Sequence, residues 1–171
     1  MAEAAILSRR EQKNTAESRG SVLVVDDNLD VRESLQTLLE MEGYVTDGAE
    51  TGEEGIAKIG EQVLDLVLLD IGLPDRSGLE VLATIRDTAP DLPVIMITAQ
   101  GTVDNAVRAM SSGATNFITK PWDNDKLLAD VAAAVQRRRT EEENQQLKRA
   151  LKQRYNFENI VGKSEPMLKV F

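Results

Sequence analysis

Residues 66–78, LVLLDIGLPDRSG, place a carboxylate at the end of an apolar run and follow it with a turn-rich segment. Four consecutive apolar residues bounded by turn signals are typical of a parallel strand that is covered on both faces. In open parallel sheets, ligands bind in the crevice at the carboxyl ends of the strands. We therefore expect Asp70, which ends the run, to face a crevice rather than the core.

Three further apolar runs also end in polar side chains. Asp26 and Asp27 follow the first run, Thr98 closes another, and Lys120-Pro121 follows the last. Because the carboxyl ends of parallel strands meet at one edge of a sheet, these groups are expected to converge on the first carboxylate. The combination predicts a site that accepts a phosphoryl group.

The apolar runs alternate with helical periods, which is the βαβ pattern of an α/β protein with a doubly wound parallel sheet. Strands are predicted near 22–26, 44–47, 65–70, 93–98 and 115–119. Capping boxes at Thr51 to Glu54 and at Ser77 to Glu80 predict two helix starts. Three apolar stripes are predicted to face the core, formed by Val31, Leu35, Leu38 and Leu39, by Val103, Ala106, Val107 and Met110, and by Leu127, Leu128, Val131 and Val135.

Composition limits the function. The 171 residues carry a net charge of −9, which argues against direct nucleic-acid binding and favours a divalent cation as a guest. Without Cys or His, the chain has no disulfide, no Cys/His zinc site and no His-dependent catalytic pair. No apolar stretch approaches the roughly 20 residues that a membrane span needs, and residues 1–20 lack the apolar core of a signal peptide. We expect a soluble cytoplasmic protein.

The last helix is predicted to begin near Asp123 and to run to about Leu151 or Tyr155, because neither Gly nor Pro interrupts it. Its later apolar positions are out of step with the earlier stripe. Asn144 lies three residues before Leu147 and seven before Leu151, a spacing that favours a two-stranded coiled coil. A solvated helical linker is the alternative.

Phosphorylation of a carboxylate requires a metal and donors for the transferred oxygens. Asp27, Asp70, Asp26 through water and a backbone carbonyl near Gly72 are candidate ligands of Mg²⁺. The alternative for the Asp26-Asp27 pair is capping of the next helix.

Thr98 and Lys120 are candidate donors of a hydroxyl and an ammonium group to those oxygens. Alone, the first could be an ordinary strand residue and the second a surface lysine. We expect both to lie in an exposed crevice, where their substitution changes stability little.

With these motifs the chain resembles the response-regulator receiver domains of two-component signalling, the CheY-like family, over about residues 21–139. The resemblance implies a flavodoxin-like (βα)5 sheet of order 2-1-3-4-5 and phosphorylation of Asp70 by a histidine kinase with Mg²⁺. It also implies a switch residue at Phe117, three positions before Lys120; an ordinary core aromatic is the alternative there. Such a domain catalyses only its own phosphorylation and dephosphorylation.

Residues 155–167 are similar to the opening of the AAA+ ATPase domain in NtrC-type, sigma-54-dependent activators. This resemblance implies a truncated transcriptional regulator that forms a homodimer through the last helix and the linker. Sigma-54 RNA polymerase and DNA would be contacted only by missing downstream domains. The expected organisation is a flexible tail at 1–20, a receiver domain at 21–139, a helical or coiled-coil linker at 140–156 and the start of the ATPase domain at 157–171.

Three other functions are weighed against this one. A phosphorelay or scaffold receiver shares the chemistry but lacks the transcriptional output. An Asp-nucleophile phosphatase of the haloacid-dehalogenase kind needs a second Asp two residues after the nucleophile, where Gly72 stands. A coiled-coil adaptor would leave the polar cluster without a purpose.

Overall fold

A computed structural model describes residues 18–161, with side chains described for 18–154. Residues 1–17 and 162–171, which hold most of the predicted tail and of the predicted domain start at 157–171, lie outside the described part. All five predicted strands are present, with ends within two residues of the expected ones. The elements are β1 (Ser21–Val25), α2 (Leu29–Met41), β2 (Val45–Ala49), α3 (Gly52–Glu61), β3 (Leu66–Leu69), α4 (Gly78–Thr88), β4 (Val94–Thr98), α5 (Val103–Ser111), β5 (Asn116–Thr119) and α6 (Asn124–Val161).

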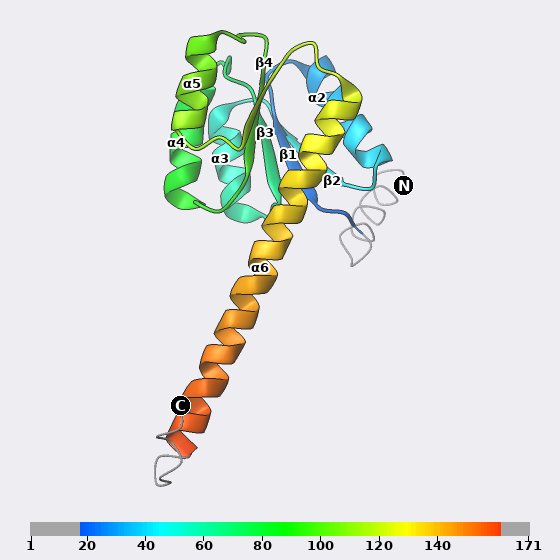
Figure 1. Ribbon diagram of the computed structural model, residues 1–171. Coiled ribbons are helices and arrows are strands. Elements are labelled where there is room, and N and C mark those ends of the chain that lie inside the picture. Colours follow the sequence, from blue (N-terminus) through cyan, green and yellow to red (C-terminus); the bar gives the residue numbers. More distant parts are fainter. Residues whose placement is uncertain (1–17, 162–171) are drawn as a thin grey trace. The chain divides into compact units, whose positions relative to one another are not determined.

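The strands form one parallel sheet in the order β2-β1-β3-β4-β5, which confirms the predicted topology. Figure 1 shows α3, α4 and α5 on one side of this sheet and α2 with the first part of α6 on the other. Side chains alternate along each strand, so Leu23 and Val25 join the cluster under α3 to α5, while Val22 and Val24 join the cluster under α2 and α6.

The helix starts follow the predicted capping chemistry in part. The Thr51 hydroxyl accepts a hydrogen bond from the Glu54 N–H at 3.0 Å, but the Glu54 carboxylate accepts from the N–H of Glu50. Ser77 caps α4 by accepting from the N–H of Leu79 at 3.2 Å. Thr51 and Ser77 therefore both cap their helices. In neither case does the Glu three residues later accept a hydrogen bond from the N–H of the capping residue, as a full capping box requires.

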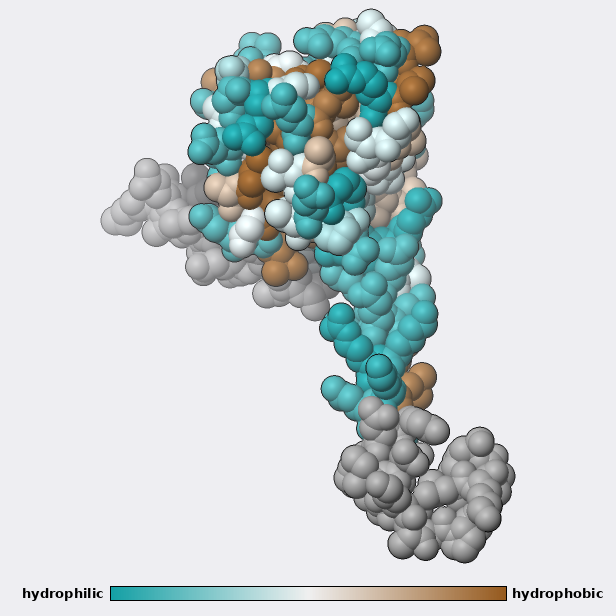
Figure 2. All heavy atoms as spheres, turned by 90° about the vertical axis from the view of Figure 1, so that its left-hand side faces the viewer, coloured by the Kyte–Doolittle hydropathy of each residue, from teal (hydrophilic) through white to brown (hydrophobic). Residues whose placement is uncertain are grey.

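One predicted core stripe is wrong at three of its four positions. Val103, Val107 and Met110 on α5 are 81%, 57% and 49% exposed. The helix instead packs through its small residues, with Ala109 buried and Ala106, at the edge of the predicted stripe, half-buried. Figure 2 views the molecule from this side and shows hydrophobic patches between hydrophilic ones.

The other two stripes are confirmed. Leu35 and Leu39 of α2 are buried, as are Leu127, Val131 and Val135 of α6. The remaining residues of these stripes are half-buried and pack against the same core cluster, namely Val31, Leu38 and Leu128.

Two compact units divide the chain between Arg138 and Arg139, so α6 contributes to both. In the second unit the helix continues to Val161, beyond the predicted end, because nothing in its sequence interrupts it. Leu147 and Leu151 are 61% and 65% exposed. Among the described residues, no helix is both long and apolar enough to cross a membrane.

Candidate phosphoryl-acceptor site

Three carboxylates meet at the carboxyl edge of the sheet. Asp26 follows β1 and Asp70 follows β3, and they are 2% and 7% exposed, whereas Asp27 is exposed. One carboxylate oxygen from each lies within 4.8 Å of the others. The structure therefore brings together the three acids that the sequence predicted to converge.

The strand order explains this convergence. β1 pairs directly with β3, with Val25 opposite Leu69, so the residues that follow the two strands lie side by side. The N–H of Asp70 donates to the carbonyl of Val25 at 3.0 Å and continues the ladder by one bond. At Gly78 a Cβ would overlap the carbonyl oxygen of Asp70, so only glycine lets α4 start this close to the acid.

Lys120 connects two of the acids. Its Nζ lies 2.7 Å from Asp26 Oδ2 and 3.1 Å from Asp70 Oδ2. Burial by itself lowers the pKa of Lys120, but the hydrogen bond and charge of Asp26 and the charge of Asp70 outweigh it, so this pKa lies above its ordinary value. The ammonium group is therefore charged at neutral pH. The Lys120-Pro121 peptide bond is cis.

Thr98 and Lys120 are less exposed than the sequence predicted. Thr98 is 1% exposed and the Lys120 side chain is 16% exposed. The expectation of freely exposed crevice residues is wrong on this point. Thr98 Oγ1 accepts a hydrogen bond from the N–H of Gln100 at 3.1 Å, so the group that Thr98 can offer to a ligand is its hydroxyl hydrogen.

Two other predicted residues lie close by in the fold. The N–H of Gly72 donates to Asp70 Oδ1 at 3.3 Å, while the predicted role of its carbonyl as a metal ligand stays a prediction. Phe117 is half-buried on β5 and packs against the core cluster under α3 to α5. Its role as a switch also stays a prediction.

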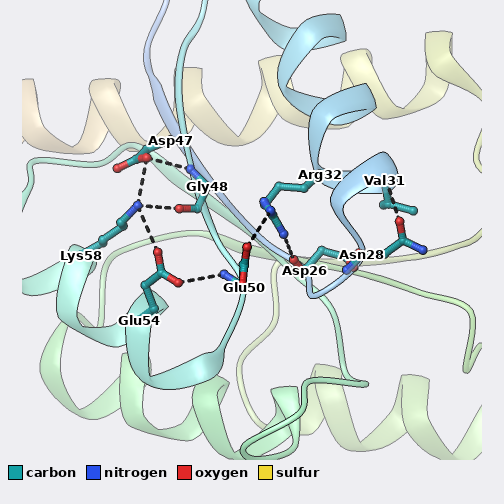
Figure 3. A network of polar contacts seen from close by, with 9 residues as sticks. All are labelled: Asp26, Asn28, Val31, Arg32, Asp47, Gly48, Glu50, Glu54 and Lys58. Carbon is teal, nitrogen blue, oxygen red and sulfur yellow. Dashed lines mark hydrogen bonds and ion pairs between the residues drawn. The ribbon is translucent and has the colours of Figure 1, made fainter.

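Arg32 was missing from the predicted residues. It is 7% exposed, and one arm of its guanidinium donates to the backbone carbonyl of Asp26 at 2.7 Å. The other arm donates to Glu50 Oε1 at 3.3 Å (Figure 3). A single Arg in an amphipathic helix gives no sequence signal that separates a buried from a solvated position.

The donor set fits a hard divalent cation. Mg²⁺ takes carboxylate, carbonyl and water oxygens, and three converging carboxylates supply such ligands. Without a cation the acids would repel one another, and Lys120 is the cation that the structure places between two of them.

The comparisons with known proteins agree with this geometry. A family model described as "Response regulator receiver domain" matches residues 22–132. The response regulator protein PilR of Pseudomonas aeruginosa is 37% identical over 150 residues, which are 88% of this chain and 32% of PilR. The chain spans about half or less of the length of the curated relatives that it matches.

Solved structures give the same match. The CheY-like receiver domain protein from Methanospirillum hungatei superposes with a TM-score of 0.68 at 34% identity, over 71% of this chain and 97% of that one. NtrX from Brucella abortus, in complex with ATP, superposes with a TM-score of 0.70 at 34% identity, over 75% of this chain and 30% of that one.

Proposed function

The chain belongs to the response regulator receiver domain family, and we propose on this basis that Asp70 accepts a phosphoryl group from the phosphohistidine of a sensor histidine kinase. The observation that carries the proposal is the arrangement around Asp70. This carboxylate lies beside two more acids and within 3.1 Å of the Lys120 ammonium, at the edge of the sheet where ligands bind.

The transfer is a displacement at phosphorus. A carboxylate oxygen of Asp70 forms the new P–O bond while the P–N bond to the kinase imidazole breaks, and the electron pair of that bond leaves with the imidazole. Lys120 and the Thr98 hydroxyl donate hydrogen bonds to the transferred oxygens. The chain acts here on itself and does not turn over a separate substrate.

The residues Asp26, Asp27, Asp70 and the carbonyl of Gly72 would hold Mg²⁺. Bound there, the ion supplies neutralising charge for the acceptor carboxylate and the transferred oxygens. Lys120 then exchanges part of its contact with the acids for contact with the phosphoryl group.

The proposed output is control of a sigma-54-activator ATPase, and through it of transcription, in a longer cytoplasmic protein. Its support is the resemblance of residues 155–167 and the greater length of the related regulators. The proposed boundaries are a tail at 1–20, a receiver at 21–139, a linker at 140–156 and the start of the ATPase domain at 157–171. We place the homodimer contact on the last helix and the linker, and the switch between states at Phe117.

The test is phosphorylation by a small phosphodonor, measured by intact-protein mass spectrometry. The parent protein should gain one phosphoryl group in the presence of Mg²⁺ and none after chelation. Asp70→Asn should gain none, because an amide is not a nucleophile. Asp87→Asn, an exposed acid of α4, is the control and should behave as the parent. The same adduct in Asp70→Asn would overturn the assignment.

A further inference from the structure

The junction between β2 and α3, residues 50–53, contacts both of the loops that carry the acids. The first contact is made through Arg32, whose guanidinium bonds the Glu50 carboxylate and the carbonyl of Asp26 at the same time. That carbonyl belongs to the peptide unit between Asp26 and Asp27. The orientation of this peptide unit therefore fixes backbone angles of both Asp residues, and these angles determine where the two carboxylates lie (Figure 3).

The second contact is made by Asp75, in the loop between Asp70 and α4. Its Oδ1 accepts from the N–H of Gly52 at 2.8 Å, and its Oδ2 accepts from the N–H of Glu53 at 2.9 Å. These amides belong to the first turn of α3, whose N–H groups have no partner within the helix. Asp75 thus fastens its loop to the same junction that holds the other acidic loop.

We propose that the Glu50 carboxylate and the backbone N–H groups of Gly52 and Glu53 form a positioning element of the metal site. They act through Arg32 on the loop of Asp26 and Asp27, and through Asp75 on the loop of Asp70. The inference rests on the proposed function and extends it. Three carboxylates repel one another when no metal is bound, and Lys120 bridges two of them, so further contacts that hold their loops favour a preformed site. The junction does this with contacts that use no carboxylate of the acid cluster, so these contacts persist when the metal binds.

The residue types fit the task. The Arg guanidinium is a planar fork that bonds a carbonyl and a carboxylate together, which a Lys ammonium does less well. Asp75 has two acceptor oxygens for two N–H groups. The short bridge between Gly72 and Ser77 keeps the loop compact, so fixing Asp75 also fixes the segment that begins at Asp70.

The experiment measures the dissociation constant of Mg²⁺, by titration of the amide chemical shifts, in the unphosphorylated protein. Asp75→Ala releases one loop, and Arg32→Lys loosens the other while keeping its charge. Each should raise the dissociation constant about 10-fold, as loss of supporting contacts around metal ligands does. If Arg32→Lys does not fold, Glu50→Ala releases the same contact from its exposed end.

Two neighbouring substitutions are matched controls. Thr51→Ala removes another hydrogen bond from the first turn of α3, to Glu54, without touching either loop. Glu53→Ala removes an acidic charge from the same junction but keeps the N–H that Asp75 accepts. Both should change the dissociation constant less than about twofold, because neither moves a ligand.

An unchanged dissociation constant in both Asp75→Ala and Arg32→Lys would overturn the inference. An equal loss in Thr51→Ala would overturn it as well, because the effect would then come from the helix start alone. Asp27→Ala tests the proposed function separately: it should weaken Mg²⁺ binding. If it binds Mg²⁺ as tightly as the parent, the metal site itself is wrong.

Discussion

Lys120 holds two nearly buried carboxylates in the metal-free protein, which makes it part of the stability of the fold as well as of the site. Lys120→Ala should lower the free energy of unfolding by about 1–3 kcal/mol, because buried acids are left without their hydrogen-bonded partner. Millimolar Mg²⁺ should restore more stability to this variant than to the parent, since the ion replaces the missing charge. Urea unfolding with and without Mg²⁺ measures both effects. Lys126→Ala, an exposed lysine of α6, should show neither.

The raised pKa of Lys120 predicts a pH dependence. A base whose pKa is higher in the folded state stabilises the fold fully below its unfolded pKa, and this contribution is lost as the pH rises through the folded value. The parent should therefore lose stability as the pH rises above about 10.5. Lys120→Met should lose less over the same range. The measurement is urea unfolding of both metal-free proteins at several pH values. If the free energy of unfolding falls equally with pH in the parent and in Lys120→Met, Lys120 is not coupled to the acids.

Gly78 allows the closest backbone contact in the site. Gly78→Ala places a Cβ against the carbonyl oxygen of Asp70, so α4 or the Asp70 loop has to move. We expect a loss of about 1–3 kcal/mol in unfolding free energy and a weaker affinity for Mg²⁺. Gly60→Ala, where no atom lies near an added Cβ, is the control and should be neutral or stabilising. A stable Gly78→Ala with unchanged Mg²⁺ affinity would contradict the close contact.

At the scale of elements, the strands and their polar ends could be predicted because each apolar run is short and bounded by turn residues. The convergence of the acids could be predicted because the carboxyl ends of parallel strands meet at one edge of the sheet. The face of α5 could not be predicted, since Val103, Ala106, Val107 and Ala109 form two overlapping stripes and only packing selects between them. The contacts of Arg32 and Asp75 join loops that are distant in sequence, and no local pattern marks them.

The corrected face of α5 can be tested by paired substitutions. Val107→Ala should change the free energy of unfolding by less than about 0.5 kcal/mol, because Val107 is exposed. Val131→Ala on α6 should lower it by about 2 kcal/mol, because its side chain is fully buried and leaves a cavity. Urea unfolding of the two variants gives the comparison. Similar losses in both would mean that α5 packs through its larger side chains after all.

At the scale of the whole molecule, we propose that the helix of the second unit contacts a second copy of the chain. With Asn144 and Leu151 at a positions and Leu147 at d, Glu143 falls at g and Lys148 at the next e position. In a parallel pair these two charges face each other across the helices and attract. Leu147 is exposed, whereas Val131 nearer the start of α6 is buried in the core, so a probe of dimerisation belongs on Leu147.

The last prediction couples this pairing to phosphorylation. The chain has no Cys, so Leu147→Cys introduces a single thiol, which can form a disulfide only with Cys at the same position of a second copy. A d position faces the same position of its partner helix only in a parallel pair. A phosphoryl group adds about −1.5 to −2 charge beside Thr98 and Lys120, and we propose that Phe117 then repacks on β5. A ligand shifts an equilibrium only by its different affinity for the two states, so useful switching requires about 1–3 kcal/mol of coupling.

Sedimentation velocity and disulfide formation in the Leu147→Cys protein, with and without phosphodonor and Mg²⁺, measure that coupling. The association constant or the crosslinking rate should change on phosphorylation, and Asp70→Asn in the same background should remove the change. A dimer that already exists and rearranges satisfies the proposal as well as a monomer that associates, because both require the phosphoryl group to favour one pairing. Identical association and crosslinking in the two states would disconnect Asp70 from the last helix, and the phosphoryl signal would then have to leave the domain through another face.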